Sequence, residues 1–98
     1  MLIRIHKSCR DVVAICDSDL IGRRFEQGKF QLDLKESFYK GKEIEKEELI
    51  ERMINLHKED VTFNIVGKES ISCALKAGII SKEGIKKISG IPYTLIFL

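Results

Sequence analysis

The sequence lacks the features that mark membrane-spanning, secreted and disulfide-stabilised proteins. No apolar run approaches the roughly 18 residues that a helix needs to cross a bilayer, and charge interrupts the first seven positions too early for a signal peptide. Three cysteines, Cys9, Cys16 and Cys73, are an odd number, and no two of them have C-x-x-C spacing. We therefore predict a cytoplasmic protein without membrane contact or disulfides, in which Cys16 and Cys73 are small buried residues.

Motifs for catalysis and cofactor binding are missing as well. The sequence contains no P-loop, no G-x-S-x-G elbow, no H-E-x-x-H helix and no dinucleotide-binding glycine pattern. His6 and His57 are the only histidines, and nothing local orients either of them against a nucleophile. We expect a protein that is not an enzyme and that holds no cofactor and no metal.

The composition is that of a compact globular domain. The chain has 98 residues, of which 44% are hydrophobic and 33% charged, with one proline. This length predicts a single domain over residues 1–98 with one modest core and no deep substrate cavity. The oligomeric state stays open.

Hydrophobic patterning in the first third of the chain predicts strands. Residues 2–5 and 12–16 form a hairpin across a polar loop, and the unbroken apolar run 12–16 is typical of a central strand covered on both faces. Residues 17–28 begin with helix-capping side chains and predict a helical turn followed by a loop. Alternation over residues 29–34 predicts a half-exposed strand that buries Phe30, Leu32 and Leu34.

The remainder alternates between helices and strands. Residues 43–58 predict an amphipathic helix with an acidic first turn, and residues 61–66 predict a strand. A second helix follows and ends at a left-handed Gly78, with one further turn at residues 81–84. Two strands, 85–89 and 93–97, close the chain around a bend at residues 90–92. This order predicts the α+β class: a two-layer α/β sandwich with a mixed, mostly antiparallel sheet and two main helices on one face.

Two short segments contain groups that can bind ions. Asp17 and Asp19 follow the predicted central strand and suit a divalent cation; the alternative is that Asp17 or Ser18 accepts hydrogen bonds from the turn that follows. Gly67 and Lys68 lie between a strand and a helix, where the free amides of Lys68 to Ile71 either bind a phosphate or belong to an ordinary capped turn.

The formal net charge of +2 is unevenly distributed. Residues 36–60 carry five basic against eight acidic side chains, whereas the flanking segments carry twelve against seven. With the acidic excess concentrated around one helix, the basic side chains predict a positive face that suits RNA phosphates. They are Arg4, Lys7, Arg10, Arg23, Arg24, Lys68, Lys86 and Lys87. A mixed, solvated surface is the alternative.

Five segments of the chain resemble a small archaeal family known as domain of unknown function 424. They are C-D-S-D-L-I-G at residues 16–22, F-E-Q-G at 25–28, S-F-Y-K-G at 37–41, N-I-V-G-K-E at 64–69 and G-I-P at 90–92. The resemblance covers essentially the whole chain in the same order. It implies a two-layer α/β sandwich and RNA binding associated with translation.

The resemblance also implies positions for a shared functional site. These are Asp17, Asp19, Gly22, Arg23, Phe38, Tyr39, Gly41, Asn64, Gly67 and Lys68. Several of the glycines are equally explained as turn residues with positive φ. Where the family often has histidine after G-[VI]-P, this chain has Tyr93. That departure argues against catalysis by a histidine.

Three functions remain open at this stage. The first is a non-enzymatic RNA-binding or ribosome-associated module, in which basic side chains contact phosphates and Tyr39 stacks on a base. The side chains expected to bind phosphate are Arg23, Arg24, Lys68, Lys86 and Lys87. The second is a protein-interaction adaptor that uses the acidic helix 43–58. The third is a small hydrolase or metal enzyme built around Asp17 and Asp19.

Overall fold

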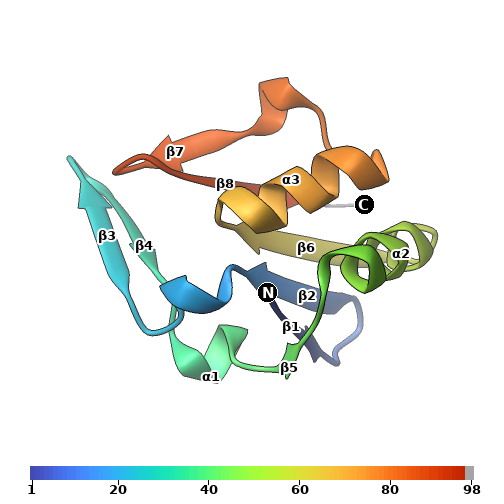
Figure 1. Cartoon of the computed structure of the whole chain (residues 1–98). Helices are drawn as coiled ribbons and strands as arrows, with labels where there is room; N and C mark the ends of the chain where they lie inside the picture. Colours follow the sequence, from blue (N-terminus) through green and yellow to red (C-terminus); the bar gives the residue numbers. More distant parts are fainter. Residues whose placement is uncertain (97–98) are drawn as a thin grey trace.

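The computed structural model describes residues 1–96 and has one six-stranded sheet with helices on one face (Figure 1). The strand order is β5-β1-β2-β6-β8-β7. The strands are β1 (Leu2–His6), β2 (Asp11–Cys16), β5 (Lys42–Glu43), β6 (Val61–Val66), β7 (Lys86–Ile88) and β8 (Ile91–Ile96). Only β2 and β6 pair in parallel, with Val13 beside Phe63 and Ile15 beside Ile65. The predicted mixed, mostly antiparallel sheet is confirmed.

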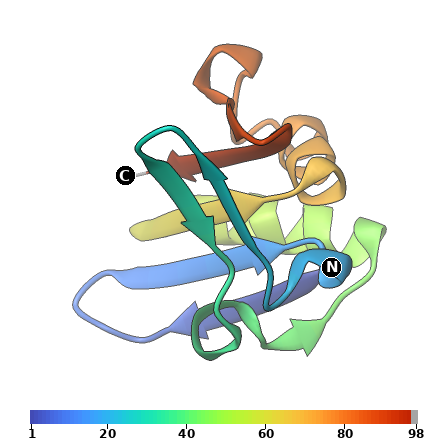
Figure 2. The ribbon, with the colours of Figure 1, turned by 90° about the vertical axis from the view of Figure 1, so that its left-hand side faces the viewer.

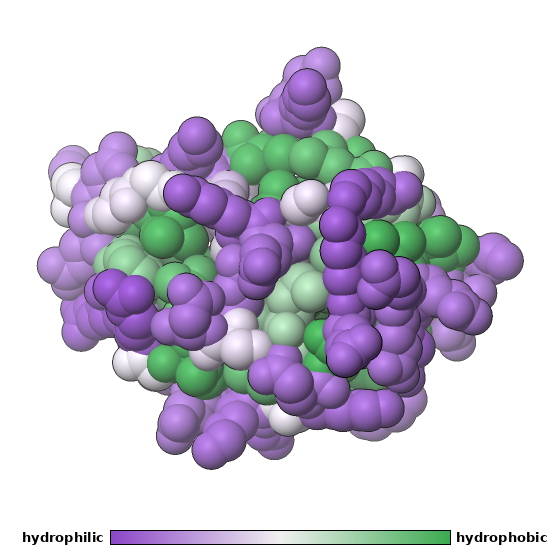
Figure 3. Space-filling view, viewed as in Figure 1, coloured by the Kyte–Doolittle hydropathy of each residue, from purple (hydrophilic) through white to green (hydrophobic). Residues whose placement is uncertain are grey.

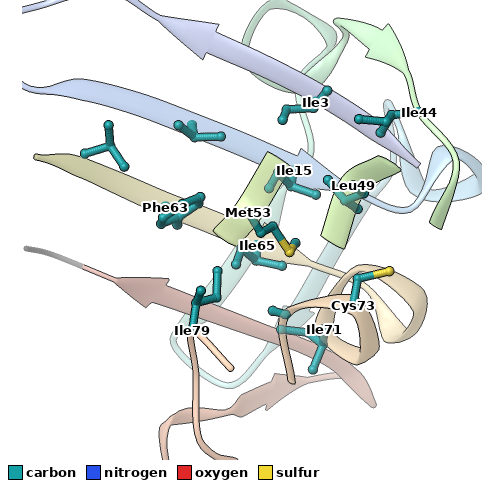
Figure 4. Close-up of a cluster of buried hydrophobic side chains, with 13 residues drawn as sticks. Ile3, Ile15, Ile44, Leu49, Met53, Phe63, Ile65, Ile71, Cys73 and Ile79 are labelled. Carbon is teal, nitrogen blue, oxygen red and sulfur yellow. The ribbon is translucent and has the colours of Figure 1, made fainter. Parts of the chain in front are cut away.

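Helices α2 (Lys46–His57) and α3 (Lys68–Ala77) cover one face of the sheet. Both amphipathic helices direct apolar residues inward, Leu49 and Met53 from α2 and Ile71 from α3. These side chains pack against Phe63 and Ile65 in the core that Figure 4 shows. Gly78 ends α3 with φ of +75°, and Ile79 packs back onto the core, so the predicted C-cap is confirmed.

The other face is partly covered by a hairpin that the hydrophobic pattern of the sequence did not predict. Strands β3 (Arg24–Gln27) and β4 (Phe30–Asp33) form a separate two-stranded sheet that lies across the large one (Figure 2). We expected a loop where β3 lies. The strand was missed because its inner side contributes only Phe25, which is half-buried, while Arg24, Glu26 and Gln27 are exposed.

The short α1 (Glu36–Tyr39) and the 3₁₀ turn η1 (Ser18–Leu20) complete this second layer. The core beneath it consists of Leu2, Ala14, Cys16, Leu20, Leu34, Tyr39 and Val66. Leu34 is fully buried and Leu32 is half-buried, as expected. Phe30 is 68% exposed, so its predicted burial is wrong. It follows the tight turn at Gly28 and Lys29, at the tip of the hairpin and beyond the buried cluster.

Several predicted boundaries also shift. The acidic helix begins at Lys46 instead of residue 43, because Glu43 pairs with Leu2 in the edge strand β5. The closing strands turn at Ser89 and Gly90, both with positive φ, so Ile91 and Pro92 belong to β8 instead of to a bend. One further turn forms as η2 (Lys82–Gly84). Of the predicted last strand, residue 97 lies outside the described residues.

Candidate functional site

The two segments with ion-binding groups meet at one edge of the sheet. Asp17 follows β2 and Gly67 follows β6, and the Asp17 N–H donates to the Val66 carbonyl at 3.1 Å. Because β2 and β6 are parallel, their carboxyl ends lie side by side, which is where α/β sheets commonly bind ligands.

The Asp17 carboxylate is buried and caps α3. Its Oδ1 accepts hydrogen bonds from the Ser70 N–H and the Ser70 hydroxyl, both at 2.8 Å, and its Oδ2 accepts one from the Glu69 N–H at 3.1 Å. The carboxylate therefore supplies the negative charge that a helix N-terminus favours, from a residue more than fifty positions away. The expected local cap is wrong, since the turn η1 receives no side-chain hydrogen bond from Asp17.

Gly67 makes this cap possible. Its φ of +108° and ψ of +154° belong to a region that only glycine adopts readily. A Cβ at this position would also overlap the Asp17 carboxyl group. Glycine is thus required at position 67 both by the positive φ of the backbone and by the close approach of Asp17.

The cap occupies the amides at the start of α3 that a bound phosphate would use. Two of the amides considered for phosphate binding, those of Glu69 and Ser70, already donate to Asp17, so the protein's own carboxylate takes that place. Asp19 is exposed, whereas the buried Asp17 carboxylate is engaged by α3. Within residues 1–96, no three His, Cys, Asp or Glu side chains are grouped closely enough to hold a metal ion.

Beside the cap, a shallow pocket of about 230 Å³ brings together side chains from both segments. It is lined by Asp17, Asp19, Leu20, Arg23, Lys68 and Ile91. Two of the predicted phosphate-binding residues, Arg23 and Lys68, therefore do lie together. The Arg23 guanidinium also sits 5.0 Å from the centre of the Phe25 ring, in a cation–π contact.

A second pair of predicted basic residues lies where the two hairpins meet. Lys86 and Lys87 border a pocket of about 210 Å³ that we call the hairpin groove. The groove is lined by Gln27, Phe30, Lys86, Lys87, Ile88 and Tyr93. An adjoining pocket of about 300 Å³ shares Lys86 and Tyr93 and extends to Leu95, which is 52% exposed. Figure 3 shows apolar surface between the β3–β4 hairpin on the left and the neighbouring strands.

The hairpin groove is held in shape by Ser89. The Ser89 N–H donates to the Gln27 side-chain oxygen at 2.8 Å, and its hydroxyl donates to the Glu26 carbonyl at 2.7 Å. These bonds fasten the tip of the β3–β4 hairpin to the turn between β7 and β8. The β3–β4 hairpin and the β7–β8 strands thus form the two walls of the groove and are joined at one end.

Tyr39 does not have the role predicted for it. The residue is 7% exposed, and burial raises its pKa to about 12. Its ring meets the Phe38 ring edge-on within the core beneath the hairpin. Tyr39 therefore offers no free face to a base, whereas Phe30 at the hairpin tip does. The sequence signal for this exposure was the two-residue Gly28-Lys29 turn immediately before Phe30.

The other positions implied by the resemblance are dispersed. Phe38 stacks on His6 with ring centres 4.6 Å apart, and Gly41 packs closely against β1. Gly22 forms the base of the β3–β4 hairpin, where its N–H donates to the Leu34 carbonyl at 2.7 Å. Asn64 is half-buried in the middle of β6. The structure does not bring these four residues to the Asp17 edge as one site.

The predicted positive face also divides into smaller groups. Arg4 donates to the Lys40 carbonyl, Lys7 pairs with Asp11, and Arg10 pairs with Asp60. Arg24 contacts Glu26 and Gln31 at 2.9 and 2.8 Å. Among residues 1–96, by contrast, Arg23, Lys68, Lys86 and Lys87 form no ion pair with an acidic side chain. Of the eight basic residues predicted to form the positive face, these four are therefore the ones whose side chains have no acidic partner or hydrogen bond within the described part of the chain.

The cysteines lie as predicted. Cys16 and Cys73 are buried, and Cys9 is exposed. Burial raises the pKa of the Cys16 thiol to about 12, so this thiol stays protonated near neutral pH. None of the described helices is long and apolar enough to cross a membrane.

The fold and the Asp17–Gly67 edge define an α+β protein with a mixed six-stranded sheet, two helices on one face and a hairpin on the other. The chain belongs to the family described as "Protein of unknown function (DUF424)", which matches residues 6–98. The predicted family membership is confirmed. A crystal structure of an uncharacterized conserved protein from Methanopyrus kandleri is similar, with a TM-score of 0.87 and 25% sequence identity. The similarity covers 98% of this chain and 89% of that one. No curated protein matches the chain.

Proposed function

We propose that the protein binds single-stranded RNA at the hairpin groove. The observation that carries this proposal is the exposed Phe30 ring in the same groove as the unpaired Lys86 and Lys87. Exposing a phenylalanine is unfavourable in water, and its π-face suits an unpaired base. The two ammonium groups suit the phosphates on either side of that base.

Two further features support this use of the surface. Tyr93 adds a second, half-buried ring to the groove, and Leu95 continues the apolar surface along β8. Arg23 and Lys68 provide more unpaired cations at the other end of the β3–β4 hairpin. A strand of RNA that follows the hairpin would meet cations at both ends and aromatic rings at one.

The test is the affinity of the protein for a single-stranded RNA, measured by fluorescence anisotropy over a series of salt concentrations. Phe30→Ala should weaken binding by about 1–3 kcal/mol, or roughly 5- to 150-fold, with little change in salt dependence. The Lys86→Ala, Lys87→Ala pair should reduce the slope of log affinity against log salt by up to about 1.4.

Matched controls remove the same chemistry elsewhere. Ile54→Ala removes another exposed apolar side chain, and the Arg52→Ala, Lys58→Ala pair removes the same charge from α2 and its end, on the other face of the sheet. Both controls should bind RNA almost as well as the parent protein. The proposal fails if the parent does not bind RNA at low salt, or if the groove variants bind as well as their controls.

A second candidate function is the protein-interaction adaptor. The exposed face of α2 presents Ile54, which is 40% exposed, on the same helical stripe as Glu47 and Glu51. An apolar residue among carboxylates suits a basic protein partner. Capture of partners from a nuclease-treated lysate separates the two candidates: a partner that survives nuclease and is lost with Ile54→Ala favours the adaptor.

A further inference from the structure

A pocket distinct from the hairpin groove lies between the first turns of α2 and α3. Its volume is about 220 Å³, and it is lined by Met1, Lys46, Lys68, Glu69, Ser72 and Cys73. Lys46 and Lys68 are the first residues of their helices, and both helices begin at the same end of the sheet. Figure 3 shows apolar atoms near the centre of the view, beside the N-terminus marked in Figure 1, with hydrophilic side chains around them.

Two of the lining residues, Lys46 and Lys68, are lysines, and a third lysine, Lys76, is close enough to Lys46 to be affected by its charge. Lys68 and Ser72 line it, and Lys76 lies on the same stripe of α3, because these residues are four positions apart. Interaction with the Lys46 side chain on α2, together with its positive charge, lowers the pKa of Lys76. Among residues 1–96, none of the three lysines forms an ion pair.

The acidic groups nearby offset this charge only in part. Glu43 accepts a hydrogen bond from the Met1 amino group at 2.6 Å and one from the Ser18 hydroxyl, which is shared between its two oxygens, so it is engaged outside the lysine cluster. Asp17 is engaged by the first turn of α3. Glu69 borders the pocket, and Glu47 acts on Lys76 only weakly beside the effect of Lys46. Like charges in contact are unfavourable, and an anion between them removes that cost.

The donors of this site are side chains. The Glu69 and Ser70 amides at the start of α3 are already used by Asp17, so the helix N-terminus has little to offer a ligand. The ammonium groups of Lys46, Lys68 and Lys76 and the hydroxyl of Ser72 remain. Mobile ammonium groups with one hydroxyl suit the tetrahedral oxygens of a phosphate.

We propose that this pocket binds a phosphate group through Lys46, Lys68, Lys76 and Ser72. At about 220 Å³ the pocket is smaller than the roughly 300–1,000 Å³ of sites for drug-sized ligands. It therefore fits inorganic phosphate or pyrophosphate, or the terminal phosphate of a longer molecule. The site shares no lining residue with the hairpin groove, whereas Lys68 also lines the pocket beside Asp17.

The first experiment titrates the protein with pyrophosphate and follows its backbone amide resonances and its binding heat. Resonances of Lys46, Lys68 and Ser72 should shift and saturate, while sodium chloride at the same ionic strength leaves them in place. The Lys46→Gln, Lys76→Gln pair should weaken binding at least tenfold. The matched Lys58→Gln, Lys82→Gln pair removes the same charge elsewhere and should leave the affinity within twofold. Equal shifts with chloride, or equal affinity of the two pairs, would overturn the proposal.

A charge-reversal variant separates loss of the binding site from loss of stability. Lys76→Glu places a carboxylate beside Lys46 and should raise the melting temperature without ligand while abolishing the response to pyrophosphate. A Lys76→Glu variant that still binds pyrophosphate with parental affinity would contradict the site.

Two RNA oligonucleotides, identical except for a 5′-phosphate or a 5′-hydroxyl, separate the two sources of phosphate. Tighter binding of the phosphorylated RNA, lost in the Lys46→Gln, Lys76→Gln pair, identifies an RNA end as the ligand. Equal binding of both RNAs with retained pyrophosphate binding identifies a free anion. Failure of pyrophosphate and of the 5′-phosphate together overturns the proposal, whatever the result at the hairpin groove.

Discussion

The two faces of the central sheet are covered in different ways. On one face, α2 and α3 bury a continuous core that includes Phe63, Leu49 and Met53, each without exposed surface. On the other face, a short hairpin and single turns bury a smaller core and leave Phe30 and Leu95 in solvent. Helices with a wide apolar stripe can close a face, whereas a four-residue strand buries alternate residues only. The helical face therefore buries the larger core, and the hairpin face leaves large apolar side chains exposed.

The first prediction tests the helical face. Phe63→Ala removes the largest fully buried side chain and should lower the free energy of unfolding by about 3–5 kcal/mol. Urea denaturation followed by far-ultraviolet circular dichroism measures this change. On the hairpin face, Phe30→Ala should alter the free energy of unfolding by no more than about 0.5 kcal/mol. Equal losses at the two positions would remove the distinction between the faces.

The second prediction concerns the edge that joins them. Gly67→Ala forces a Cβ against the Asp17 carboxyl group at a φ of +108°, and should cost about 3 kcal/mol. Gly28→Ala is the control, because that glycine also has positive φ but has open space around it. Its cost should be about 1 kcal/mol. A smaller effect at Gly67 than at Gly28 would contradict the close contact with Asp17.

The third prediction concerns the cap itself. Asp17→Ala removes three hydrogen bonds to α3 and should cost about 2 kcal/mol, with faster amide exchange at Glu69 and Ser70. Asp19→Ala removes an exposed carboxylate two residues away and should change the free energy of unfolding by less than about 0.5 kcal/mol. The assignment of the cap is wrong if the two variants are equally stable.

The fourth prediction tests how the hairpin is fastened. Ser89→Gly removes the hydroxyl that bonds the Glu26 carbonyl while it tolerates the positive φ of this turn. The free energy of unfolding should fall by about 1 kcal/mol. Hydrogen exchange should quicken within β3 and β4 and stay unchanged in β6. A uniform increase across the sheet would show that the hairpin is not an independent layer.

The smallest expected effect is at the N-terminus. Hydrogen bonds from the Met1 amino group and Ser18 lower the pKa of the exposed Glu43 carboxyl from its ordinary 4.5. A lowered folded-state pKa contributes stability above the ordinary pKa, and this contribution is lost as the pH falls through the folded value. Glu43→Gln should therefore cost less than about 1 kcal/mol at pH 7. The difference from the parent should shrink below pH 4.5, and a constant difference would contradict the ion pair.

The elements that the sequence predicted correctly are those with the strongest hydrophobic patterns. The apolar run at residues 12–16 and the stripe through Leu49 and Met53 correctly predicted a central strand and a helix, because tertiary burial reinforces both patterns. Strand β3 could not be predicted, since it has a single half-buried apolar residue and owes its conformation to pairing with β4. Family membership was likewise predictable, from motifs spread over the chain.

The candidate site was predicted less well, for a physical reason. The grouping of Arg23 with Lys68 and of Lys86 with Phe30 depends on how distant segments meet, which no local spacing reveals. The Asp17 cap joins residues more than fifty positions apart and has no local signature. Tyr39, which we expected to stack on a base, is buried, and Phe30, which we expected to be buried, is exposed. Alternation indicates which residues share a face but not where the covering layer ends.

The base of the β3–β4 hairpin is closed by its own backbone. Gly22 donates to the Leu34 carbonyl at 2.7 Å, and Leu34 donates to the Arg23 carbonyl at 3.0 Å. These two backbone hydrogen bonds hold the two ends of the segment together, whatever residues lie between them. The length and tip of this hairpin can consequently change without altering the register of the large sheet, because the closure of its base does not depend on them.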